Sequence, residues 1–390
     1  MNKKQKTPLT QKQGFVSFMG SVLAILCGLV VGFLVLLLSD PANAVNGFIS
    51  ILTGAFSDMK NLGQVFYSAT PIILTGLSVG FANKTGLFNI GGPGQFVVGA
   101  YVAVLIGVKC TFIPGPLLWI ICLVGAMLAG ALWGFVPGFL KAVCNVNEVI
   151  ACIMMNYIGM YGVNFLVVET IFDSQKNQSL PVAANANAPK LGMDQIFRSG
   201  ASASSVNAGI FVAILAGIVI YFLIAKTKFG YELKACGYNR DAAKYAGINE
   251  KRSIILSMAI AGSLCALGGA CLYLAGAGKG IEVVDTLAAE GFNGIPVALL
   301  GLNNPIGIIF AGLFMAYLNQ GGFNMQLYGF APQVIEIIIA VIIYFAAFSL
   351  LLRGLVTKVV KRAGKGKASS QNANAEPAKD GGTVKGGGEE

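Results

Sequence analysis

The residues best suited to bind a polar ligand lie in one short stretch, GLFNIGGPGQ, at positions 86–95. Asn89 and Gln95 carry amides, which donate and accept hydrogen bonds and so match a neutral polar molecule. The glycines around them, including Gly91 and Gly94, make a continuous helix costly and let the backbone approach a ligand. We therefore predict that both amides face a ligand. The alternative is that they only cap helix ends.

A second stretch, GFNGIPVALLG at 291–301, repeats the glycine, phenylalanine and asparagine character of the first. Asn293 is the counterpart of the amides in the first stretch. Phe88 or Phe292 offers an aromatic face on which a planar ring could stack. Two related halves of a chain would produce such an echo, so the sequence allows a two-half pseudo-repeat.

Residues for catalysis or metal binding are scarce. The chain has no histidine, and its 8 cysteines form no CxxC pair, so we predict neither a metal centre nor a disulfide framework. The glycine–lysine segments at 276–280 and 364–367 lack the spacing and the following hydroxyl of a nucleotide-binding loop. We predict no catalytic residue, no enzyme activity and no cofactor bound by this chain.

The elements that hold these stretches must be membrane helices. Of the 390 residues 55% are hydrophobic and 11% are charged, whereas a soluble domain has about 25% charged residues. The predicted fold class is an all-α polytopic membrane protein with about 8–10 transmembrane helices, some of them broken or half-helices. Short alternating segments typical of a β-barrel are missing from the sequence. The predicted spans are 15–38, 66–82, 94–108, 117–136, 148–168, 208–225, 253–275, 304–321 and 333–352, with 290–302 as a half-span.

The basic residues indicate how the chain is oriented. With the N-terminus inside, 21 of the 27 lysines and arginines fall in inner segments and six in outer loops. This asymmetry is what the positive-inside rule expects of a plasma-membrane protein with both termini in the cytoplasm. The net charge of +10 is therefore attributed to orientation and anionic lipid, and no nucleic-acid partner is predicted.

Three regions follow from this organisation: a cytoplasmic segment at 1–14, a transmembrane domain at 15–355 and a disordered cytoplasmic tail at 356–390. The tail is rich in glycine and lysine and offers too little apolar surface to fold. An alternative is that the first span is a cleaved signal peptide. Its 24 apolar-rich residues exceed the 7–15 of a signal-peptide core, which disfavours that alternative.

Backbone broken at membrane depth persists only where protein or a water-filled cavity satisfies its polar groups. The stretch at 86–95 is therefore predicted to line or support a path across the membrane, unless it is a simple turn between two spans. An ion-coupled transporter acting alone is the alternative function class. It would need ionisable groups at depth, and Glu148, Glu169 and Glu336 all lie near span ends.

The inner loop at 228–253 contains a predicted short helix, Arg240 to Ala246, with Asn239 as its N-cap and Gly247 as its left-handed terminator. Asn249 is predicted to cap the next span. A helix this short is marginal alone and needs a docking surface. An ordinary basic loop is the alternative. The candidate docking residues are Arg240, Asp241, Ala242, Ala243, Tyr245 and Gly247.

Three motifs in the same order resemble the permease subunits of ABC importers of the ribose/nucleoside branch. They are GLFNIGGPGQ at 86–95, FGYELKACGYNRDAAKYAGI at 229–248 and EGFNGIPVALLGLNNPIG at 290–307. The resemblance covers roughly 60–350 and is nearest to the nucleoside-type members. Gly92-Pro93 departs from the family pattern, in which a small residue and an acid are common, and this puts the substrate preference in question.

The resemblance implies a function and a set of partners. Such permeases pair with a second permease, dock on a cytoplasmic ATPase that hydrolyses ATP, and receive substrate from an external binding lipoprotein. The loop at 228–253 is similar to the family's coupling loop. The long outer loop from Glu169 to Asn207 is the predicted contact for the lipoprotein, with Pro181 and Pro189 limiting its conformations. The carried solute is expected to be a nucleoside, and less so a simple sugar.

Overall fold

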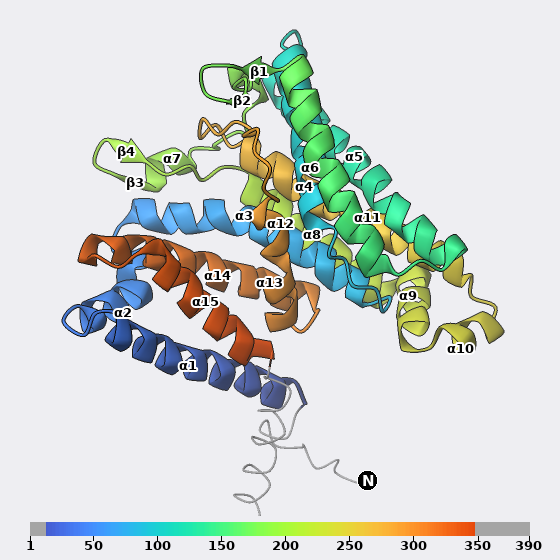
Figure 1. Cartoon of the computed structure of the whole chain (residues 1–390), viewed down its shortest axis with the longest axis horizontal. Coiled ribbons are helices and arrows are strands. Elements are labelled where there is room, and N and C mark those ends of the chain that lie inside the picture. The colour runs from blue at the N-terminus through green and yellow to red at the C-terminus, as the bar shows by residue number, and fades with distance from the viewer. Residues whose placement is uncertain (1–12, 348–390) are drawn as a thin grey trace, which may run out of the picture.

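The computed structural model describes residues 13–347, which fold almost entirely into helices (Figure 1). Seven of the described helices are long and apolar enough to cross a membrane, which confirms the all-α polytopic class. They are α3 (Met59–Asn83), α4 (Gly92–Lys109), α5 (Gly115–Cys144), α6 (Glu148–Thr170), α8 (Gly209–Lys226), α11 (Glu250–Tyr273) and α14 (Pro305–Met325), the last continued by the 3₁₀ turn η4 (Gln326–Tyr328). Residues 1–12 and the predicted tail at 356–390 lie outside the described part of the chain.

The other helices flank or interrupt this set. They are α1 (Gln13–Ser39), α2 (Ala44–Thr53) with the 3₁₀ turn η2 (Gly54–Phe56), α7 (Met193–Ile196), α9 (Lys228–Tyr238), α10 (Arg240–Tyr245), α12 (Ala289–Phe292), α13 (Gly294–Leu300) and α15 (Pro332–Ala347). Every predicted span coincides with a helix over the residues that the structure describes, and 348–352 of the last span lie outside them. The predicted half-span divides into α12 and α13 at Asn293. Helices α2, α7 and α9 were not predicted.

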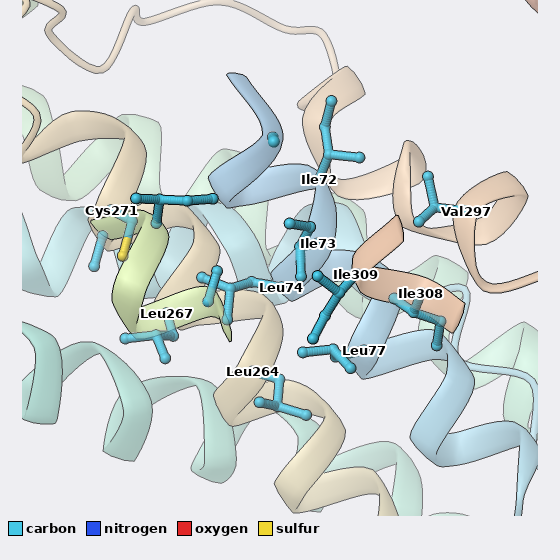
Figure 2. Packing of buried hydrophobic residues seen from close by; sticks show 14 of the residues in the cluster. Ile72, Ile73, Leu74, Leu77, Leu264, Leu267, Cys271, Val297, Ile308 and Ile309 are labelled. Atoms are coloured by element: carbon cyan, nitrogen blue, oxygen red, sulfur yellow. The ribbon is translucent and has the colours of Figure 1, made fainter. Parts of the chain in front are cut away.

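Helix α3 forms the centre of the bundle. In its most apolar stretch 89% of the residues are buried, because α4, α8, α11, α13 and α14 surround it. Figure 2 shows its side chains packed against three of these helices: Ile72, Ile73, Leu74 and Leu77 of α3 with Leu264, Leu267 and Cys271 of α11, Val297 of α13, and Ile308 and Ile309 of α14. In Figure 1, α1 and α15 lie side by side on one flank of the molecule, and α5 and α6 lie on the other.

Helices α5 and α11 pack through glycines. A Cβ on Gly130 would lie 2.4 Å from the carbonyl oxygen of Gly262, and a Cβ on Gly134 would lie 2.4 Å from that of Met258. The only side-chain atom this close is the Cβ of Ala266, 2.2 Å from the position of a Cβ on Gly130. Small residues are the usual means of close helix packing in lipid, where the hydrophobic effect does not drive helices together. Much of the chain's glycine content therefore serves helix packing.

The loop at 171–208 is folded and packs on the bundle. It contains two small hairpins, β1 (Phe172–Asp173) with β2 (Gln178–Ser179) and β3 (Arg198–Ser199) with β4 (Ser202–Ala203), and the 3₁₀ turn η3 (Ala184–Ala186). Ser179 exchanges two hydrogen bonds with Ile281, at 2.8 and 2.9 Å, and so ties this loop to the segment between α11 and α12. Figure 1 places the hairpins at the end of the bundle opposite to α9 and α10.

Candidate functional site

The broken stretch leaves α3 at Asn83 and begins α4 at Gly92 without a helical link. Gly86 turns the chain back into the bundle with a φ of 71°, a conformation that glycine adopts without strain. Residues 87–91 then run non-helically into the bundle, and Pro93 occupies the first turn of α4, where its missing N–H costs nothing. The predicted helix break is confirmed.

Two side chains, Asn89 and Asn156, hydrogen-bond this irregular backbone, and Ser78 and Gln95 in turn bond Asn89. We call Ser78, Asn89, Gln95 and Asn156 the amide cluster. Asn89 donates to Oε1 of Gln95 at 2.9 Å and accepts from Nε2 of Gln95 at 3.1 Å, and it also donates to Ser78. Asn156 of α6 accepts from the Gly94 amide and donates to the Ile90 carbonyl, both at 3.0 Å. Buried polar groups of the break are thus paired, as membrane depth requires.

The predicted substrate-path residues fall in different surroundings. Asn89 and Gln95 are each 1% exposed and bind one another, so in this conformation neither faces an open space. Phe88 and Phe292 are half-buried, and Asn293 is exposed at the end of α12. Direct contact of Phe88, Phe292 and Asn293 with a substrate stays a prediction, whereas the pairing of Asn89 with Gln95 favours the alternative that these amides hold the backbone in place.

The two similar stretches, 86–95 and 291–301, contact one another through their backbones. A Cβ on Gly92 would lie 2.4 Å from the Gly291 carbonyl oxygen, and a Cβ on Gly291 would lie 2.4 Å from the Pro93 nitrogen. We call Gly92, Pro93 and Gly291 the glycine contact. Cys265 of α11 donates its S–H to the Gly92 carbonyl at 3.1 Å on the same spot. The close approach explains why glycine stands at both positions, because any side chain would collide with backbone.

A cavity of about 520 Å³ lies beside the glycine contact, at the end of the bundle that carries the 171–208 loop. Val97 of α4, one turn beyond Pro93, and Glu290, next to Gly291, mark its inner end. Its walls come from α6, the end of α11 and the segment at 278–289, and Gln178 of β2 lies at its edge. This volume falls in the range of roughly 300–1,000 Å³ that small-molecule sites occupy.

One tyrosine lines this cavity, and a second belongs to a packed group of side chains that includes residues of the lining. Tyr273 lines the cavity, and Tyr67 of α3 belongs to the cluster of side chains against which Val97, Tyr273 and Ala288 pack. Tyr67 is 7% exposed, and its hydroxyl has no hydrogen-bond partner within the described residues. An unpaired buried hydroxyl costs about 1–3 kcal/mol, so such a group is expected to serve a purpose.

The loop between α8 and α11 forms two short helices at the opposite end of the bundle. Asn239 accepts a hydrogen bond from the Ala242 amide at 3.0 Å, and Asn249 accepts one from Arg252 at 3.1 Å. Gly247 has a φ of 79°, and the Ile248 amide bonds back to the Ala243 carbonyl, which closes the helix end. The predicted caps and terminator are all present. Residues 228–238, expected as loop, form α9, which Thr227 caps.

Helices α9 and α10 enclose a second, open cavity of about 550 Å³ lined by Tyr231, Tyr238 and the alanines of α10. Tyr245 is 94% exposed, and Asp241 and Ala242 are exposed beside it. Ala243, one of the candidate docking residues, is 4% exposed and packs inward. Arg240 is half-buried, close enough to Glu148 to interact electrostatically with it.

Comparison with known proteins shows the family of the chain. The family described as "Branched-chain amino acid transport system / permease component" matches residues 61–347. The chain belongs to this permease family. The match confirms the resemblance that the three motifs indicated.

Three curated relatives match almost the whole permease. The guanosine ABC transporter permease protein NupP of Bacillus subtilis is 38% identical over 87% of this chain and 96% of its own length. The nucleoside ABC transporter permease protein NupB of Lactococcus lactis is 34% identical over 86% and 93%. The glucose ABC transporter permease protein TsgB13 of Haloferax volcanii is 32% identical over 87% and 90%. No solved structure matches the chain.

The carboxylates on which an ion-coupled permease would depend lie near the helix ends. Glu148 is bound to Lys141 at 2.9 Å, and Glu169 and Glu336 are exposed. None of the three lies in the core around α3. The family match and these positions disfavour the ion-coupled alternative.

The sequence alone did not reveal the cavity or its tyrosines. Tyr67 lies near the start of the predicted span 66–82, where a lone tyrosine is an ordinary core residue. Glu290 did offer a signal, because it directly precedes the second glycine stretch and is one of few acids so close to an apolar run. The contact between Gly92 and Gly291 could have been expected from the echo between the two stretches.

Proposed function

We propose that this permease component imports nucleosides as a transmembrane subunit of an ATP-driven transporter. The observation that carries the proposal is the similarity to guanosine and nucleoside permeases over more than 90% of their length. A cavity large enough for a nucleoside, next to a helix break, is consistent with it. A simple sugar is the second candidate, because the glucose permease TsgB13 is also similar over most of its length.

The substrate path runs from the cavity toward the amide cluster. The glycine contact lies between them and closes the path in this conformation. The amide cluster holds the broken backbone in place on the other side of that contact, so that Asn89 and Gln95 support the path. Opening requires Gly92 and Gly291 to separate.

A cytoplasmic ATPase docks on α9 and α10 and hydrolyses ATP in place of this chain. Support comes from the exposed tyrosines and the open cavity between the two helices. This segment also touches the broken stretch. A Cβ on Gly237 of α9 would lie 2.4 Å from the Lys84 carbonyl oxygen, and Thr85 donates to Ser257 of α11 at 2.7 Å. A movement of α9 is therefore passed directly to the residues that precede Gly86.

Both termini lie on the ATPase side, in the cytoplasm, and the 171–208 loop faces outward toward a substrate-binding lipoprotein. Helices α12 and α13 together link the cavity end of the bundle to the opposite end of α3, where Asn303 accepts a hydrogen bond from Asn83 at 3.1 Å. They count as one further pass. Helix α15 runs antiparallel to α1, with Ile338 against Gly32 and Phe345 near Cys27. The chain then crosses the membrane an even number of times, which leaves both termini on the same side.

A second permease chain completes the path. Helices α5, α6 and α8 support this, because only 33% of the residues in the most apolar stretch of each are buried. The relatives NupQ of Bacillus subtilis and NupC of Lactococcus lactis, each named a permease alongside NupP and NupB, are 25% and 27% identical to this chain.

The proposed function is tested by deleting this permease from its host and measuring uptake of labelled guanosine, adenosine, cytidine and glucose at low concentration. Loss of nucleoside uptake, restored by the full-length chain, is the expected result. Affinity purification of the tagged chain should bring down a nucleotide-hydrolysing subunit and a second permease. Loss of glucose uptake with nucleoside uptake intact would favour the second candidate instead.

A further inference from the structure

A group of polar side chains at the cavity matches one particular kind of ligand. Tyr273 and Glu290 come from the end of α11 and from α12, and Tyr67 comes from α3, which is far from both in the sequence. The negative charge of Glu290 interacts electrostatically with the hydroxyls of both tyrosines. Tyr273 and Glu290 line the same cavity, and Tyr67 and Tyr273 belong to the same packed group of side chains. We call these three residues the tyrosine–glutamate cluster.

Tyr67 supplies the second, independent observation. Its hydroxyl is buried and has no hydrogen-bond partner within residues 13–347, although the amide cluster nearby is fully paired. Protein interiors rarely leave such a group unpaired unless a water or a ligand completes it. A hydroxyl can accept one hydrogen bond and donate another, so it complements a ligand hydroxyl or amine.

Glu290 supplies the other half of the recognition. It lines the cavity, is half-buried, and has no ion-pair partner among the described residues. An ionised carboxylate only accepts hydrogen bonds, and its two oxygens can take two adjacent donors at once. A neutral ligand with a pair of neighbouring donors fits this carboxylate. Lys279 and Glu282 also line the cavity, so the lining carries two acids and one lysine, a net negative charge that disfavours an anionic ligand.

We propose that the tyrosine–glutamate cluster binds a paired hydrogen-bond donor of the imported solute, with Glu290 accepting both bonds. This inference rests on the proposed function. In a ribonucleoside two groups have this chemistry: the vicinal 2′- and 3′-hydroxyls of ribose, and the N1–H and N2 amine edge of guanine. The cluster is next to the glycine contact, so the solute is held where the path opens.

Competition for uptake distinguishes the two donor pairs, the ribose hydroxyls and the guanine edge. Guanosine carries both donor pairs, adenosine carries only the ribose pair, and 2′,3′-dideoxyguanosine carries only the guanine edge. In the full transporter, Glu290→Gln should raise the half-saturating concentration of guanosine roughly tenfold, the size of one lost hydrogen bond. An equal rise for adenosine with none for dideoxyguanosine identifies ribose. The reverse pattern identifies the guanine edge.

Matched variants keep the test specific. Asp285→Asn removes an acid from the same segment, outside the cavity lining, and should change none of the three constants. Tyr67→Phe removes only the unpartnered hydroxyl and should raise the guanosine constant, whereas Tyr161→Phe, on an exposed face of α6, should not. Glu290→Asp keeps the charge but shortens the side chain, and it replaces Glu290→Gln in the assay if Glu290→Gln fails to reach the membrane.

Two results overturn the inference. Unchanged constants in Glu290→Gln and Tyr67→Phe, with the wild-type protein importing nucleosides, remove the cluster from binding and leave the proposed function intact. An equal loss for all three solutes shows a general effect on transport rather than recognition. Failure of the wild-type protein to import any nucleoside refutes the proposed function itself, and the inference with it.

Discussion

Gly92 and Gly291 bring two distant segments of the chain into direct backbone contact, with the Gly291 carbonyl oxygen 2.4 Å from the position that a Cβ on Gly92 would occupy. The contact joins the start of α4 to the end of α12, and Glu290, the residue before Gly291, lines the cavity. Because neither glycine has a side chain, the two backbones meet directly. Such a junction suits a closure that must open and reseal in every transport cycle.

Gly291→Ala tests this closure. The added methyl group must displace Pro93 or the carbonyl of Gly92, and overpacking of this kind costs about 1–3 kcal/mol. We expect lower thermal stability and a loss of uptake greater than the loss of membrane-inserted protein. Gly162→Ala on α6 is the control, because nothing lies within 4 Å of its Cβ. Full uptake in Gly291→Ala would mean that the two segments need not close on one another.

The paired amides of Asn89 and Gln95 predict a different outcome. Gln95→Ala leaves both hydrogen-bonding groups of the buried Asn89 amide short of a partner, at a cost of about 1–3 kcal/mol. Uptake should fall in step with protein level, and the order in which nucleosides compete should stay the same. Competition assays on Gln95→Ala and Asn89→Ala check this. A changed order would show that these amides touch the substrate.

Gly247→Val should uncouple the permease from its ATPase. Gly247 has a φ of 79° and open space around its Cβ, so valine adds backbone strain of about 1–2 kcal/mol without a collision. The end of α10 should fray, and less ATPase should copurify at an unchanged level of inserted permease. Gly192→Val is matched to it, with a φ of 77° and the same open surroundings at the other end of the molecule. Equal ATPase recovery in both variants would refute docking on α10.

Lys84 predicts a dependence of stability on pH. Burial, and then the positive charge of Lys234, lower the pKa of Lys84 from its usual value. Because the folded state disfavours the charged lysine, its cost is fully present below the folded pKa. The cost disappears as the pH rises through the window between the folded and unfolded values. Lys84→Gln should therefore raise the melting temperature near neutral pH, and the gain should shrink in alkaline buffer.

Melting curves of detergent-purified protein between pH 7 and pH 10, roughly up to the ordinary pKa of lysine, measure this gain. Lys176→Gln, an exposed lysine in the 171–208 loop, gives the baseline. A gain that stays constant with pH would indicate that the substitution acts through packing and not through charge.

Local rules predicted much of this fold. The spans followed from runs of apolar residues, and Asn239, Gly247 and Asn249 followed from cap chemistry, because each of these features depends on a few neighbouring residues. Helix α9 could also have been found. Thr227 precedes it as a cap, and Gly230, Leu233 and Cys236 form its buried face at helical spacing.

The cavity could not have been predicted in the same way. Tyr67, Tyr273 and Glu290 meet only because α3, α11 and α12 pack together, and no property of each residue's neighbours encodes that meeting. The partners of Asn89 illustrate the same limit. The sequence indicated that its amide was functional, but only the packed structure shows that Gln95, six residues later, is its partner.

The close packing of α5 against α11 through glycines, which we call the glycine seam, has a consequence for folding during translation. Gly130 and Gly262 are far apart in the chain, and α6, the 171–208 loop and α8 to α10 are synthesised between them. During translation α5 therefore enters the bilayer with its glycine face uncovered, and it waits there until α11 arrives. Before α11 is made, nothing from α11 covers the glycine face of α5. A chain whose synthesis stops before α11 should therefore be degraded by membrane proteases. Contacts this distant in sequence also form slowly, which makes this seam a late step of folding.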